Sequence, residues 1–217
     1  GHLSVQIRES LNRLIRDERG ETIVKLRAFV AGAGDARRVQ DVVSDLFTDK
    51  KLPLPVLTII QVGALGNDAS QVVFESITSG RDGINPSGLA FFAGEKGPSL
   101  TAAIAKLTGN MQAAAVTPVN VVSATCFASF LSDYAAMREK LTGAFPQAAA
   151  NLVQAVRDPV DSSVTCEAIG RLSSANAPDK LTHITQSRVA FVNGDKIVFT
   201  GLQLSFGTFL DDATSAL

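Results

Sequence analysis

Residues 20–47 show a strand-like and then a helix-like pattern of apolar residues. In residues 20–30 the apolar even positions from 24 to 30 alternate with Lys25, Arg27 and Phe29, which predicts a half-buried strand. From Asp35, a suitable N-cap, helical spacing takes over. The apolar residues at this spacing are Val39, Val42, Val43, Leu46 and Phe47.

The same order of elements returns 98 residues later. Residues 118–128 predict a second strand and residues 129–145 a second helix, so that Phe29 corresponds to Phe127 and Asp35 to Asp133. The second copy is five residues shorter between its helix and the next strand, so that residues 58–77 of the first copy correspond to residues 151–169 of the second. In this second alignment Gln61 matches Gln154, and Glu75 matches Glu167.

Each copy is preceded by a helix-compatible segment, at residues 5–18 and 100–115, and the second copy also has a short strand at 88–94. We therefore predict an α/β (α+β) fold of two units, each a mixed β-sheet with two helices on one face. We expect the two units to pack with their sheets side by side.

Residues 187–206 form two apolar runs around Asn193-Gly194-Asp195, a strong hairpin signal. The hairpin either begins a third copy or folds back to complete the first unit. The first unit has no strand before its first helix, which favours the second alternative. The expected units are then residues 1–80, completed by the hairpin 182–217, and residues 81–178.

Composition excludes several classes of function. The 217 residues carry a net charge of −1, which disfavours a nucleic-acid binder. No stretch approaches the roughly 20 apolar residues that span a bilayer, and the first 25 residues lack the order of a signal peptide. We expect an intracellular, cytoplasmic protein without membrane contact.

Cysteine and histidine are scarce. The two cysteines, Cys126 and Cys166, sit in apolar runs, which predicts buried free thiols. With only His2 and His183, a histidine-rich metal site or a Ser-His-Asp triad is nearly excluded. Gly32-Ala33-Gly34 lacks the third glycine of a dinucleotide fingerprint.

Residues Gln154 to Asp161, followed by Val164 to Ile169, resemble the C-terminal signature of the RidA family, also called YjgF or L-PSP endoribonuclease-like. Gly194, Thr200 and Gly201 resemble that family's opening hairpin. The resemblance implies two tandem chorismate mutase-like units, small-molecule clefts between copies and assembly into trimeric rings. It also implies hydrolysis of enamines or imines to a keto acid and ammonia, with no metal or organic cofactor.

The resemblance further implies site residues. Glu75 and Glu167 match the family's glutamate near the attacking water, although each could instead be a structural strand glutamate. Thr200 and Gly201 either line a cleft or simply end a strand.

The family's carboxylate-binding arginine is replaced in both copies, by Leu57 and by Ala150. We therefore expect a catalytically divergent protein that binds a small metabolite, with an enamine/imine deaminase as the alternative. The ribonuclease activity in the family's name is disfavoured by the net charge and by the single Tyr and absent Trp.

Overall fold

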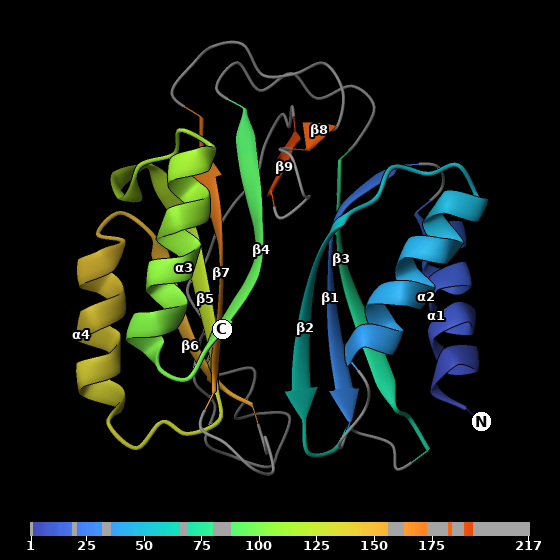
Figure 1. The fold of residues 1–217 in the computed structure, drawn as a ribbon, viewed down its shortest axis with the longest axis horizontal. Coiled ribbons are helices and arrows are strands. Elements are labelled where there is room, and N and C mark those ends of the chain that lie inside the picture. Colours follow the sequence, from blue (N-terminus) through green and yellow to red (C-terminus); the bar gives the residue numbers. More distant parts are fainter. Residues whose placement is uncertain are drawn as a thin grey trace, which may run out of the picture.

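The computed structural model describes residues 2–18, 21–31, 36–65, 69–79, 88–155 and 163–172, together with the backbone of 182–183 and 189–192. Two β-sheets form the middle of the molecule and a pair of helices covers the outer face of each (Figure 1). The fold is therefore of the predicted mixed α+β class. None of the helices in the described ranges has the length and hydrophobicity needed to cross a membrane.

The first unit contains two helices and a three-stranded sheet. Its elements are α1 (Leu3–Asp17), β1 (Thr22–Ala31), α2 (Ala36–Asp49), β2 (Val56–Val62) and β3 (Val72–Ser79). Strand β1 is central, parallel to β2 and antiparallel to β3. Apolar side chains of both helices, Ile7, Leu11, Val39, Val43 and Phe47 among them, pack on Leu26, Ala28 and Val30 of β1.

The second unit repeats this arrangement. Its elements are β4 (Leu89–Gly97), α3 (Leu100–Ala113), a 3-10 turn (Pro118–Asn120), β5 (Val121–Ala128), α4 (Tyr134–Ala144), β6 (Ala149–Gln154) and β7 (Val164–Arg171). Strand β5 is parallel to β6 and antiparallel to β7, as β1 is to β2 and β3. Registers also correspond, because Arg27 lies opposite Glu75 and Thr125 lies opposite Glu167. The structure thus supports the predicted internal repeat.

Strand β4 extends the second sheet and has no counterpart among the described strands of the first. It pairs antiparallel with β7 on one side and with β9 (Val189–Val192) on the other, and β8 (Thr182–His183) pairs with β9. The described strand of the predicted C-terminal hairpin therefore extends the sheet of the second unit. Residues 193–217, including Thr200 and Gly201, lie outside the described residues.

The two sheets stack face to face, which corrects the expected side-by-side packing (Figure 1). Helices cover only one face of each sheet, so the other faces are left to bury each other. Val24 and Val56 of the first unit pack there against Leu89, Phe91 and Ile169 of the second. This inter-sheet layer also contains charged residues and adjoins two cavities.

An irregularity in β1 corrects the predicted alternation. The pairing register with β3 shifts between Ile23 and Lys25. As a result Ile23 packs on the helix side with Leu26, whereas Val24 packs between the sheets. The shift lets Val24 and Lys25 both reach the second unit.

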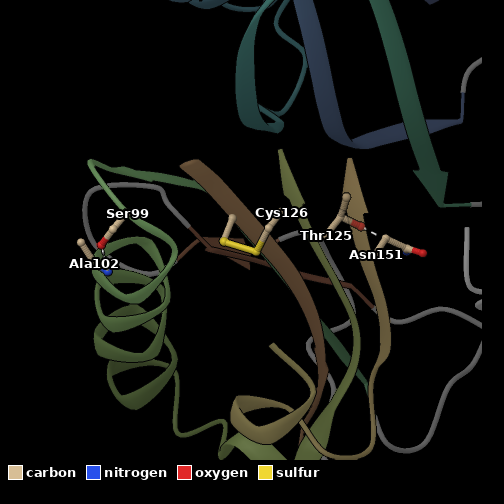
Figure 2. The surroundings of a disulfide bond; sticks show 6 residues. Ser99, Ala102, Thr125, Cys126 and Asn151 are labelled. Carbon is tan, nitrogen blue, oxygen red and sulfur yellow. Dashed lines mark hydrogen bonds between the residues drawn. A yellow bond between two sulfur atoms is a disulfide. The ribbon is translucent and has the colours of Figure 1, made fainter. Parts of the chain in front are cut away.

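The cysteines form a disulfide, which corrects the prediction of free thiols. Cys126 on β5 and Cys166 on β7 are a directly opposed pair, with their Cα atoms 4.1 Å apart (Figure 2). Both lie in the core beneath α3 and α4. Disulfides persist in oxidising compartments and are rare in the cytosol, so this bond weighs against the expected cytoplasmic location.

Candidate functional site

Two adjoining cavities open at the junction of the units, and together we call them the inter-unit cleft. The small cavity has a volume of about 80 Å³ and the large one about 430 Å³. They share three lining residues, Ile59, Lys96 and Thr165. The small cavity is further lined by Val30, Ala36, Ile60, Gln61, Phe127, Ser129, Ala155 and Ser163. The large cavity is further lined by Gln40, Val43, Ser44, Leu54, Pro55, Leu57, Ala93 and Gly94.

Lys96 and Thr165 are placed together by sheet pairing. They are directly opposed residues of β4 and β7, so their side chains emerge next to each other on one face of the sheet. Thr165 is buried and Lys96 is exposed. The cleft thus brings a cation and a hydroxyl close together where its two cavities meet.

Gly94 sets how closely the two units approach beside the cleft. Its backbone N–H donates a hydrogen bond of 2.9 Å to the Thr58 hydroxyl on β2. A Cβ at this position would lie 2.6 Å from the Thr58 methyl carbon and 2.8 Å from that of Thr165. Glycine is therefore required for β4 to pass this close to β2.

Four charged side chains form an ion cluster between the sheets: Lys25, Arg27 and Glu75 from the first unit and Glu167 from the second. Lys25 Nζ lies 3.0 Å from Glu167 Oε2, and only 3% of either side chain is exposed. The guanidinium of Arg27 donates to Glu167 Oε1 and also pairs with Glu75, whose side chain is 53% exposed. Glu167 is therefore held by two cations from the other unit.

The cluster fixes the charge state of Glu167. Burial by itself would raise the pKa of this carboxyl, but the charges of Lys25 and Arg27 and the Arg27 hydrogen bonds hold it below its ordinary value. Burial lowers the pKa of Lys25, and Glu167 opposes that effect. Burial would also lower the pKa of Arg27, but the two carboxylates raise it overall. Glu167 is consequently an ionised, paired group.

An aromatic contact connects the ion cluster to the cleft. The Arg27 guanidinium carbon lies 5.2 Å from the centre of the Phe127 ring, at cation–π distance. Phe127 also packs edge-on against Phe29, with ring centres 5.9 Å apart, and lines the small cavity. The ion cluster therefore borders the cleft without lining it.

The structure separates the residues that the sequence grouped as a site. Glu75 and Glu167 meet at Arg27, but neither lines either cavity. Leu57 lines the large cavity, whereas Ala150 packs against the helix-covered core of the second unit. The geometry gives Glu167 a structural ion pair and leaves Leu57 facing the cleft.

Several residues of this region were missed in the sequence. The alternating pattern of residues 20–30 identifies Lys25 and Arg27 only as the polar side of a strand, and no sequence pattern distinguishes Lys96 or Thr165. A difference between the two copies could have drawn attention to Lys25 and Arg27, since the second copy has Ser123 and Thr125 at the matching positions. A buried charge pair present in only one of two copies points to a contact specific to that copy.

Comparison with known proteins assigns neither a family nor a function to the chain. No model of a protein family matches the chain, and no curated protein matches it with significant similarity. Within the described ranges, no group of three or more His, Cys, Asp or Glu residues is placed to hold a metal ion.

Proposed function

We propose that the chain is a RidA-like protein that binds a small metabolite in the inter-unit cleft and has diverged from imine hydrolysis. One observation carries this proposal. A cleft lies between the two units, while Glu167, the residue matching the family's acid–base glutamate, is buried outside it and bound to Lys25 and Arg27.

The repeated topology supports the resemblance to the RidA family. Both units place two helices on one face of a mixed sheet, with the central strand parallel to one neighbour and antiparallel to the other. The resemblance implies clefts between neighbouring copies, and because two copies are joined in this chain, such a cleft lies within one polypeptide. Binding at such a cleft needs no metal or organic cofactor.

The chemistry of the cleft supports divergence. A general acid or base must reach the reacting atoms and exchange a proton near neutral pH. Glu167 meets neither condition, because two cations occupy its oxygens and keep its pKa low. Leu57 supplies neither charge nor a donor where the family places arginine.

The activity test generates the imine enzymatically from serine and follows release of the keto acid. We expect wild-type protein to leave the release at its uncatalysed rate. Leu57→Arg puts a guanidinium into the large cavity, and Ala150→Arg, directed at the helix-covered core, is its matched control. Acceleration by the wild type would contradict the divergence and favour the deaminase alternative.

The binding test measures thermal unfolding with a panel of small organic acids, amines and neutral metabolites. Ser44→Trp fills the large cavity from α2, and Thr48→Trp places the same side chain one turn further along the helix, outside the cavity lining. We expect ligand-induced stabilisation of wild type and Thr48→Trp that Ser44→Trp loses. Equal stabilisation of all three proteins would place binding elsewhere and contradict the proposal.

A further inference from the structure

Helix α4 is held to the second unit by less apolar packing than α2 is to the first. All 11 residues of α4 are described, and Leu141 is the buried one among them, whereas α2 buries five residues. At the positions that match Val42 and Leu46 of α2, the second copy has Lys140 and Ala144. Lys140 is exposed and Ala144 is half-buried. Apolar burial therefore stabilises α4 less than it stabilises α2.

A covalent bond is present where this packing is reduced. The disulfide joins Cys126 on β5 to Cys166 on β7, and the chain between them contains α4 and β6. The matching pair in the first unit is Ala28 opposite Phe74, which has no sulfur. A disulfide restricts the unfolded states of the loop that it closes, and this loop spans 40 positions. The disulfide thus compensates for the weak packing of α4.

A groove with a volume of about 620 Å³ opens between the first turns of α3 and α4, and we call it the α3–α4 groove. Its lining includes residues 98–101 at the start of α3, Ala136, Met137 and Lys140 of α4, and Phe130 and Val164. Its described lining shares no residue with that of the inter-unit cleft, so the groove is separate from the site of the proposed function.

The groove reaches close to the disulfide. Val164 lines it and lies two positions before Cys166 on β7, so both side chains emerge on the same face of the sheet, about 7 Å apart along the strand. Leu100 also lines the groove and packs in the same apolar cluster as both cysteines. Both cysteines are fully buried. A small thiol in the groove therefore needs only a local displacement of apolar side chains to reach sulfur, and the weak packing of α4 favours such local opening.

We propose that the Cys126–Cys166 disulfide is a redox-sensitive switch: oxidised, it holds α4 and β6 on the second unit, and a small dithiol that enters the α3–α4 groove releases them by reducing it. A thiolate of the dithiol attacks one cysteine sulfur, the S–S bond breaks, and the other cysteine leaves with the electron pair and takes up a proton. The second thiol of the reductant then displaces the remaining cysteine, which also ends as a thiol. Overall the dithiol loses two electrons and two protons and becomes a disulfide, and the two cysteines gain them.

The access test follows reduction of the native protein by dithiothreitol, with samples alkylated at intervals and weighed by mass spectrometry. Ala136→Trp fills the groove from α4. Ala135→Trp is the matched control, since Ala135 is the preceding alanine of the same helix and lies outside the described lining of the groove. Both alanines are exposed, so the helix accommodates either substitution.

We expect Ala136→Trp to slow reduction about tenfold relative to wild type and Ala135→Trp, because thiol exchange requires access to sulfur. Equal rates in the three proteins, or faster reduction of Ala136→Trp, would overturn the groove as the entry for the reductant.

The switch test compares amide hydrogen exchange of the oxidised and the reduced protein. We expect reduction to lower the protection of α4 and β6 at least about tenfold and to leave α2 and β2, their counterparts in the first unit, unchanged. Unchanged protection of α4 and β6 would show that the disulfide does not hold them. Equal loss in both units would show that the disulfide stabilises the whole molecule, which would also overturn the proposal.

Discussion

Glu167 shows how strongly one buried side chain depends on its partners. Its oxygens are taken by Lys25 and Arg27, and its burial leaves no solvent to replace them. Removing one member of a buried ion group leaves the remaining charges uncompensated, which costs more than the contact itself. Glu167, for which the family resemblance implies a catalytic role, thus forms a structural connection between the two units.

We predict that Glu167→Gln lowers the free energy of unfolding by about 3–5 kcal/mol, because Lys25 stays buried beside a neutral amide. Glu75→Gln is the matched control, since Glu75 pairs with the same Arg27 from an exposed position, and it should cost at most about 1 kcal/mol. Urea unfolding of both variants measures the difference. Equal losses would show that the buried pair contributes no more than the exposed one.

The same carboxyl predicts an acid-dependent stability. Its pKa is lower in the folded protein than its ordinary value of 4.5, so the unfolded chain binds the proton more readily below that value. The contribution is therefore complete above about pH 4.5 and is lost as pH falls through the folded pKa. Wild type should lose more stability than Glu167→Gln between pH 7 and pH 3. Parallel curves for the two proteins would contradict this assignment.

Strand β4 is the element that joins the two units, and its contact with β2 depends on Gly94. We predict that Gly94→Ala lowers the free energy of unfolding by about 1–3 kcal/mol, because the new methyl would overlap Thr58 and Thr165. Gly109→Ala is the control: this glycine lies inside α3 with open space around it, and alanine there should stabilise by about 0.5–1 kcal/mol. Chemical denaturation separates the two. A neutral Gly94→Ala would show that β4 can move away from β2.

Elements were the most predictable level of the structure. The helices and strands of both copies follow from apolar spacing, because burial against a single sheet face imposes that spacing. Contacts between residues that are far apart in the sequence did not follow from apolar spacing. Cys126 and Cys166 are 40 residues apart, and only the register of β5 with β7 makes them neighbours. Arg27 and Glu167 meet across 140 positions through the stacking of two sheets, which no local pattern reports.

At the scale of the whole molecule, part of the inter-sheet layer remains open. Val73 and Glu75 on β3 are 43% and 53% exposed, whereas the residues that the second unit contributes to this layer are mostly buried. We predict that chains associate into a symmetric ring, most simply a trimer, that covers such surface. Light scattering at micromolar concentration measures the mass. A value near 22.8 kDa would contradict the assembly.

Phe29 and Phe127 occupy matching positions in the two copies and touch each other. When identical chains assemble, a substitution in one chain is present in every chain, and so it changes both sides of a contact between matching positions. An ion pair across such a contact therefore requires that every chain carry both the acidic and the basic residue. Joining the copies in one polypeptide removes that constraint. Lys25 and Arg27 can then face Glu167 while Ser123 and Thr125 stand at the matching sites, so each half of the contact is free to accept mutations independently of the other.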